Sequence, residues 1–415
     1  MRIRPTKFLL ALGLLASSSL ISLAQAAELQ MWARAASAKA DQAIIDLWNA
    51  GHSDKVTLTV IPDSQVVTKL ATASQSGDVP DLVSFDLIFM PDFMKAGFFK
   101  DITDEMKKDP NYAGVAPAYR DLASYEGKIY GTALTPDVSV LIWNKDLFKA
   151  AGLDPEKPPT SLGQIHEFAK KITALGNDTY GYYFSGACGG CNIFVTSPMM
   201  VASGSKLLPA KAGDDAMTGE GVKGVLTEMK AMWKEKLIPA SAQADNGAGF
   251  LSTFESGKIG IEGTGGFAIS ALKHDKPDMN FGITFIPGLK DGQTSSFVGG
   301  DVIAVPAKSK NPDIAVQFIH WEMTDEVQLE ALAKNNIIPA RPALADNKYF
   351  KDEPRVVTTA KALGVGFTPY ALHFNDMVNA DQSPWLTMLQ TAIFDGDVDG
   401  AIATAQEALK GIAAR

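Results

Sequence analysis

The stretch that decides the fold runs from Tyr125 to Leu153, YEGKIYGTALTPDVSVLIWNKDLFKAAGL. Ile129 to Leu134 has an extended character, and Pro136 biases the residue before it away from helix. Val138 to Trp143 is a continuous apolar run, short enough for a strand that is buried on both faces. We therefore expect a strand that crosses between two lobes, then a short buried strand, then the start of a helix.

Strand-like and helix-like segments alternate before this stretch. The strand-like segments are Leu29 to Trp32, Val56 to Ile61 and Leu82 to Phe85, and the helix-like segments are Lys39 to Trp48 and Val66 to Ala73. This alternation predicts an α/β lobe with a largely parallel sheet, in which ligands bind at the carboxyl ends of the strands. Residues 32–37 and Asp86 fall at such ends.

Length, charge and the N-terminus set the class of protein. A chain of 415 residues with 46% hydrophobic content is long enough for two lobes. Residues 1–26 combine a basic start, an apolar run and a small-residue cleavage site, which predicts a secretory signal peptide cut before Ala27. Removal of its three positive residues takes the formal charge from −9 to −12, which argues against a nucleic-acid partner.

Six groups of residues carry a resemblance to a known family. They are Ser76 to Leu82, Ala96 to Ile102, Lys128 to Gly131 with Asp137 and Leu141 to Phe148, Phe254 to Phe267, Val298 to Ile319, and Pro339 to Arg341. Their order and spacing resemble family 1 extracellular solute-binding proteins of ABC importers, the maltose and multiple-sugar group. The resemblance implies a periplasmic protein, monomeric and without a cofactor, that delivers a sugar or polyol to an inner-membrane permease.

The same resemblance implies a type II periplasmic binding protein fold, like that of maltose-binding protein, with a ligand cleft between two lobes. We expect residues 27–133 and 264–323 in the N-terminal lobe, and residues 134–263 and 324–415 in the C-terminal lobe. The chain would then cross between the lobes three times, the second time near Gly263 and the third near Thr324.

The resemblance also implies a set of ligand-binding residues. Asp86 and Asp137 would face sugar hydroxyls, Phe267 would stack on a sugar ring, and Arg341 would point into the cleft. The other expected ligand-binding residues are Ser37, Gln65, Gly186, Gly266, Gly300 and Asp301. Structural alternatives remain open, since Asp86 could cap a helix, Phe267 could belong to the core, and Arg341 could form a salt bridge. The two glycines before Asp301 would leave room for a ligand against the backbone.

Cys188 and Cys191 are the only cysteines of the chain. In an exported protein a disulfide is the default, and zinc would need more ligands than this stretch supplies. A redox role would place Cys188 at a helix N-terminus, whereas the two glycines between the cysteines favour a loop. We therefore expect a structural disulfide, with redox-active or free thiols as alternatives.

Enzymatic and metal-binding motifs are weak in this chain. Asp395, Asp397 and Asp399 copy half of a calcium loop, but Gln406 stands where the bidentate glutamate belongs, so we expect a turn that leads into a helix. The five histidines show no paired spacing. We expect a binding protein, with a phosphorylated or sulfonated sugar as an alternative ligand. A glycosidase that uses Asp86 and Asp137 is the alternative from another class.

Overall fold

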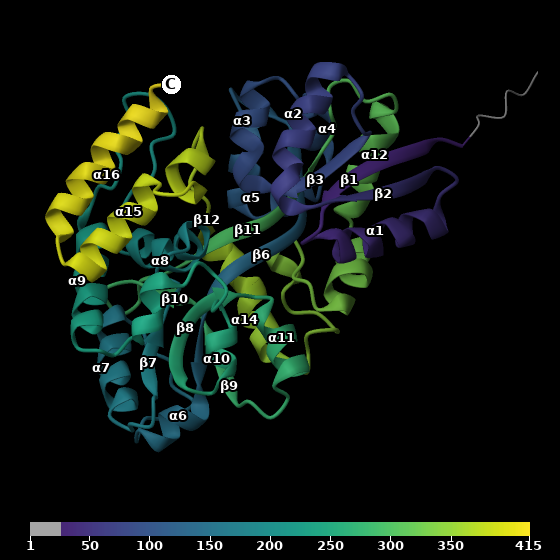
Figure 1. The fold of residues 1–415 in the computed structure, drawn as a ribbon. Coiled ribbons are helices and arrows are strands. Elements are labelled where there is room, and N and C mark those ends of the chain that lie inside the picture. The colour runs from purple at the N-terminus through teal and green to yellow at the C-terminus, as the bar shows by residue number, and fades with distance from the viewer. Residues whose placement is uncertain (1–25) are drawn as a thin grey trace, which may run out of the picture.

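The computed structural model describes residues 26–415, so the expected signal peptide lies outside the described residues. A path of seven strands in the order β2-β1-β3-β11-β6-β8-β7 runs through the whole molecule. Helices pack around both ends of this path, and Figure 1 shows two lobes with β6 and β11 between them. Across residues 26–415, each helix is too short or too polar to cross a bilayer.

The first lobe, which lies at the upper right of Figure 1, is built on the parallel strands β1, β2 and β3. The elements of this lobe come from the N-terminal third of the chain and from one later segment. The elements are β1 (Glu28–Arg34), α1 (Ala38–Gly51), β2 (Lys55–Ile61), α2 (Val66–Ser76), β3 (Leu82–Asp86), α3 (Met90–Lys95), α4 (Thr103–Lys108), α5 (Pro117–Leu122), α12 (Pro312–Glu322) and α13 (Asp325–Val327). The predicted alternation and the parallel sheet are thereby confirmed.

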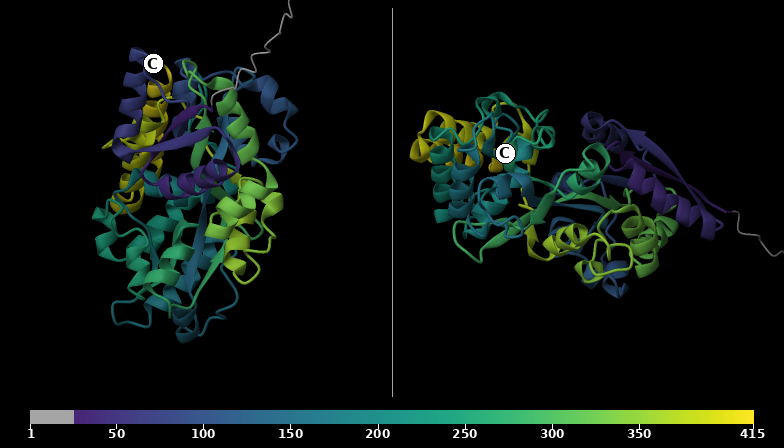
Figure 2. Two further views of the ribbon diagram at one scale, coloured as in Figure 1. Left: turned by 90° about the vertical axis from the view of Figure 1, so that its right-hand side faces the viewer. Right: turned by 90° about the horizontal axis from the view of Figure 1, so that it is seen from below.

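The second lobe is built on β7, β8 and β9. Its elements are α6 (Lys145–Ala150), α7 (Leu162–Thr173), β7 (Tyr180–Tyr183), α8 (Gly189–Ala202), α9 (Glu220–Lys234), α10 (Ser252–Glu255), β8 (Ile259–Gly265), α11 (Ala268–Asp275), β9 (Phe281–Thr284), α14 (Pro354–Ala362), α15 (Pro384–Gln390) and α16 (Val398–Ala413). The short strands β10 (Ile286–Pro287) and β12 (Gly366–Phe367) pair with β11. The short strands β4 (Ser124–Tyr125) and β5 (Lys128–Ile129) form a separate two-stranded sheet. Seen from below, the two lobes lie side by side (Figure 2).

Two long antiparallel strands join the lobes. β6 (Gly131–Asn144) pairs through its first half with β11 (Thr294–Ala304) and through its second half with β8 and β9. The two successive strands that we expected are one continuous strand, which runs through Pro136. Pro136 lies opposite Gly300, which has φ +86, and the register of the pair shifts just beyond, so the missing N–H of the proline is accommodated.

The strand pairings and loop contacts shift the expected lobe boundaries. After β8 the chain stays in the second lobe, since β9 pairs with residues 141–144 of β6, and β11 makes the second crossing. Residues 324–341 remain with the first lobe, where the Ala116 N–H donates to the Ala340 carbonyl over 3.0 Å. The third passage follows them, because Arg355 at the start of α14 stacks on Phe281 at 4.1 Å. We propose lobe boundaries at these passages.

Gly300 offers a test of the central pairing. A Cβ atom built on it would lie 2.2 Å from the Thr135 carbonyl oxygen, and its φ of +86 disfavours any side chain. We expect Gly300→Ala to lower the free energy of unfolding by about 2–5 kcal/mol, the sum of left-handed strain and overpacking. Gly292, with φ +82 and open space around it, is the matched control, and Gly292→Ala should cost only the strain. Equal losses in urea unfolding for the two variants would contradict this reading.

Candidate functional site

The first-lobe part of the site is an ion cluster at the carboxyl ends of β1 and β3. Arg34 ends β1, and its Nε lies 2.5 Å from Oδ1 of Asp301, while its Nη1 lies 3.3 Å from Oδ2 of Asp86. Asp301 is fully buried, whereas the side chains of Arg34 and Asp86 are 21% and 25% exposed. Asp301 therefore holds the guanidinium from below, and Arg34 and Asp86 face outward.

Burial raises the pKa of two carboxyl groups below this cluster. The pKa of Asp301 rises to about 6, although the positive charge of Arg34 acts to lower it. Burial raises the pKa of Asp41 to about 8, although Ser37 donates a hydrogen bond of 2.8 Å to that carboxyl group. At neutral pH Asp41 is therefore mostly protonated while Asp301 is mostly ionised, so a single buried charge supports Arg34.

Asp137 supplies the carboxylate at the crossing. Along the described strand β6 it is the one residue that is not buried. Its Oδ1 accepts the N–H of Val138 over 2.8 Å, and burial of the carboxyl group raises its pKa to about 6 despite that bond. The positive charge of Arg34 acts in the opposite direction on this pKa, so the crossing and the first-lobe cluster are within electrostatic reach of each other. Beneath them, the Tyr119 hydroxyl donates to the Gly299 carbonyl.

The second-lobe part of the site is aromatic. Phe267, which precedes α11, is 47% exposed. A Cβ atom built on Gly265 would lie 2.5 Å from the Phe267 ring and 3.0 Å from Oδ2 of Asp137, so both side chains lie against this glycine. The Phe250 ring lies beside Phe267, with 6.2 Å between ring centroids. A carboxylate and an exposed ring side by side form a surface that can take both the hydroxyl and the C–H faces of a ligand.

Other predicted site residues lie in supporting positions. Asp86 pairs with Arg34 and accepts the Ile88 N–H over 3.2 Å. It therefore caps the short 3-10 helix Leu87–Phe89, whereas the helix near residues 91–96 that we expected it to cap, α3, follows that turn. Ser37 is buried against Asp41, and Gln65 is exposed just after β2. Gly266 donates its N–H to the Val138 carbonyl over 3.0 Å and contacts α14.

The glycines at 300, 299 and 186 have close packing neighbours on the side where a Cβ atom would lie. A Cβ atom on Gly300 would meet the backbone of β6, and one on Gly299 would lie 3.2 Å from the Phe194 ring, so on this side both glycines serve strand packing. Gly186 is buried, and a Cβ atom there would lie 2.6 Å from both the Ala242 carbonyl oxygen and the Phe394 ring. Its small size allows the second lobe to pack.

Arg341 lies apart from these residues. Its guanidinium bonds Asn111 at 3.1 Å and pairs with Asp325, both in the first lobe. The salt-bridge alternative is therefore the one that the structure supports. Asp301 also changes role, because a fully buried carboxyl group acts on a ligand only through Arg34.

Cys188 and Cys191 form a disulfide, as expected. The expected loop is wrong, because Cys188 caps α8 and both intervening glycines are helical. The Cys188 sulfur accepts the Cys191 N–H over 3.1 Å, which satisfies one of the free N–H groups of the first helical turn.

The other end of the chain gives no cation site. Asp397 caps α16 by accepting the Gly400 N–H over 2.9 Å, and Asp399 pairs with Lys223. Within residues 26–415, no three carboxylate, histidine or cysteine side chains lie close enough together to hold a metal ion.

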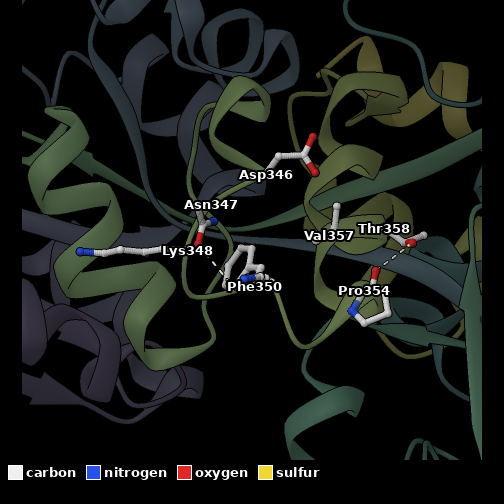
Figure 3. A pocket seen from close by; sticks show the side chains of 8 residues that line it. Asp346, Asn347, Lys348, Phe350, Pro354, Val357 and Thr358 are labelled. Atoms are coloured by element: carbon white, nitrogen blue, oxygen red, sulfur yellow. Dashed lines mark hydrogen bonds between the residues drawn. The ribbon is translucent and has the colours of Figure 1, made fainter.

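A cavity of about 680 Å³ lies elsewhere, between residues 346–351 and the start of α14. Phe350, Pro354 and Val357 line it, as Figure 3 shows. The Lys348 ammonium at its edge is paired with Glu330 at 2.8 Å. None of the predicted ligand-binding residues lines this cavity, so we place the site at the strand ends and not here.

The sequence reasoning missed Arg34, Asp41 and Phe250. Arg34 had a usable signal, since it is the one cation of the strand Glu28–Arg34 and stands at its carboxyl end, in the segment 32–37. Asp41 had none, because an acidic residue in the first turn of α1 is ordinarily a solvent-exposed partner of the helix dipole. Phe250 reads from sequence as the first residue of a short helix that ends at Phe254, which gives no sign of a ligand contact.

Comparison with known proteins identifies the family. The family described as bacterial extracellular solute-binding protein matches residues 43–358, which is most of the chain. The chain belongs to this family.

Two relatives whose names state a ligand match most of this chain at low sequence identity. A diacetylchitobiose binding protein of Streptomyces coelicolor is 25% identical, and the match covers 82% of this chain and 79% of the relative. A maltooligosaccharide ABC transporter solute-binding lipoprotein of Streptococcus pneumoniae is 26% identical over 69% of this chain and 66% of the relative.

Solved structures confirm the fold of this solute-binding protein. The cyclic alpha-maltosyl-1,6-maltose binding protein from Arthrobacter globiformis has a TM-score of 0.80 at 22% identity, over 94% of this chain and 99% of the other. A sugar-binding protein from Xanthomonas citri also has a TM-score of 0.80, at 17% identity, over 93% and 97% of the two chains. The expected maltose-binding-protein-like fold is confirmed.

Asp41 predicts a pH dependence of stability. The unfolded carboxyl group loses its proton near pH 4, whereas the folded one keeps it to about pH 8. The unfolded state then binds fewer protons between these values, so stability falls as pH rises, by up to roughly 1.4 kcal/mol per pH unit for this group. Asp41→Asn removes this titration and should make the fall of the unfolding free energy between pH 5 and 8 shallower by about that amount, while the other buried carboxyl groups still contribute to it. A profile as steep as the parent's would contradict the assignment.

Proposed function

We propose that this protein captures a neutral carbohydrate between its lobes and delivers it to an ABC permease of the inner membrane. The observation that carries the proposal is that Asp137 and Phe267 both lie against Gly265. A carboxylate accepts hydrogen bonds from two sugar hydroxyls, and an aromatic ring covers the apolar face of a pyranose. The relatives named for maltooligosaccharide and diacetylchitobiose support the same ligand class.

The charge around the site favours a neutral sugar over a phosphorylated or sulfonated one. Asp86 and Asp137 face the ligand side, while two donor atoms of the single guanidinium, that of Arg34, already pair with Asp86 and Asp301. An anionic group would meet more negative than positive charge and would lose water without gaining a free cation. Since Arg341 is paired with Asp325, it supplies no free cation for such a group either.

The family suggests where this binding takes place. Its members are described as extracellular, so we place the mature protein in the periplasm, after cleavage before Ala27. There a monomer with two lobes on a pair of long strands would close by bending of those strands when a ligand fills the site. The permease would then recognise the closed form. We propose no cofactor and no nucleic-acid partner.

Catalysis by the two carboxylates is the alternative from another class. Glycosidases keep one carboxyl group protonated at working pH, with its partner ionised. Burial does raise the pKa of Asp137 to about 6, so an assay is required. Incubation with oligosaccharides should show binding without new reducing ends, and sustained release of reducing ends would assign a glycosidase instead.

A binding screen tests the proposal directly. Thermal shift followed by calorimetry on mono-, di- and trisaccharides, polyols and phosphorylated or sulfonated sugars should give saturable, micromolar or tighter binding of a neutral member. Binding confined to the anionic sugars, or to none of the panel, would contradict the proposed function.

Asp137→Ala tests the placement of the ligand. We expect it to weaken binding of the best ligand of the screen by about 1.5–3 kcal/mol, the range for a hydrogen bond to a charged group, while the melting temperature stays near that of the parent. The control is Asp278→Ala, at an exposed aspartate of the second lobe, and this variant should bind as the parent does. Parent-like affinity of Asp137→Ala by calorimetry would move the ligand away from the crossing.

A further inference from the structure

A loop of the second lobe carries Phe250 to its place beside Phe267. We call residues 245–251 the rim loop. Oδ1 of Asp245 accepts the N–H groups of Gly247 and Gly249 at 3.3 and 2.9 Å, and Oδ2 accepts the Tyr183 hydroxyl at 2.7 Å. One carboxylate thus folds the start of the rim loop on itself and fastens it to β7.

The disulfide supports the same loop. A Cβ atom built on Gly247 would lie 3.1 Å from the sulfur of Cys191 and 3.3 Å from that of Cys188, so the bridge lies directly against this backbone. The Ala187 N–H next to it donates to the Asp245 carbonyl over 2.8 Å. The stapled start of α8 and the rim loop therefore form one packed unit.

The far end of the rim loop is held by a buried acid. Leu251 has φ +67 and ψ −43, a conformation that a leucine adopts only when its surroundings impose it. Its N–H donates over 2.9 Å to Oε1 of Glu262, which is fully buried in β8. Burial raises the pKa of Glu262 to about 8, so the group is mostly neutral at physiological pH.

Glu262 has little other use in the fold. Among residues 26–415 its second oxygen has no hydrogen-bond partner, and the neighbouring Tyr182 hydroxyl has none either. An apolar residue would fill this position in β8 without the cost of burying a carboxyl group. The bond that Glu262 does make fixes the residue next to Phe250.

The Phe250 ring, which is held in this way, enlarges the aromatic surface that Phe267 provides. The Phe250 and Phe267 rings are tilted by 39°, with 6.2 Å between their centroids, and Phe250 is half-buried. One ring covers the apolar face of one sugar unit, whereas two neighbouring rings offer a surface for two linked units.

We propose that Phe250 is a second ligand-contacting residue beside Phe267, that Glu262 is the residue which positions it, and that the ligand is a saccharide of at least two linked rings. This inference rests on the proposed function, because it specifies which carbohydrates the same site takes.

The positioning role is tested without a ligand, by hydrogen exchange of the oxidised protein. Glu262→Leu removes the acceptor of the Leu251 N–H and should speed amide exchange in residues 247–251 by about 5- to 100-fold, as expected when a hydrogen bond to a buried group is lost. Glu262→Gln keeps an acceptor oxygen at the same place and should exchange like the parent. Slow exchange in Glu262→Leu, or equal acceleration in both variants, would overturn the role of Glu262.

The contact is tested by calorimetry on the mono-, di- and trisaccharides of the screen. Phe250→Leu keeps an apolar side chain but removes the ring, and should weaken the best di- or trisaccharide by about 3- to 10-fold, while the matching monosaccharide is unaffected. Phe168→Leu, at a partly buried phenylalanine on α7, is the control. Unchanged oligosaccharide affinity, or a parent that binds monosaccharides as tightly as oligosaccharides, would overturn the inference.

The two failures are distinguishable. If the parent binds no sugar, the proposed function and the ligand contact of Phe250 both fail, and the exchange experiment still decides whether Glu262 positions the rim loop. If the parent binds sugars and Phe250→Leu binds like the parent, only the inference fails.

Discussion

The antiparallel pairing of β6 with β11 is the constraint on which the rest of the structure depends. Both strands pass between the lobes, so this single ladder fixes how the two sheets face each other. The pairing needs a glycine opposite Pro136, since any side chain on Gly300 would meet the β6 backbone. Asp137, the residue after Pro136, is the one open position of an otherwise buried strand. The pairing that joins the lobes therefore runs through the carboxylate of the candidate site.

The charged side chains around the crossing differ in how deeply they are buried. Asp301 lies buried between Asp86 and Thr135 in the strand register and holds Arg34, whose outer edge reaches Asp86. Breaking a buried pair of this kind costs about 3–5 kcal/mol, so Arg34 has little freedom to leave. Its guanidinium is therefore preorganised, and a ligand need not order it. On the opposite side Phe267 offers exposed apolar area, which a sugar ring can bury at little entropic cost.

Much of the fold was readable from local pattern. The alternating segments before Asp86 became β1, α1, β2, α2 and β3, because periodicity and strand-end residues depend on neighbours in sequence. The proposed lobe boundaries depend on long-range contacts that local pattern does not encode, such as the pairing of β9 with β6. The same limit applies to the site. Asp137 and Phe267 carry local motifs, whereas the partner of Arg341 and the burial of Gly186 depend on contacts that spacing does not encode.

The central claim is that a sugar lies between the lobes at the crossing. A crystal structure of the protein with the best-binding sugar of the screen tests it most directly. We predict sugar hydroxyls within hydrogen-bond distance of the Asp137 carboxylate, a ring face on Phe267, and the Arg34 cluster across from them. Electron density for the sugar in the cavity beside Phe350, Pro354 and Val357, with the crossing empty, would contradict the account.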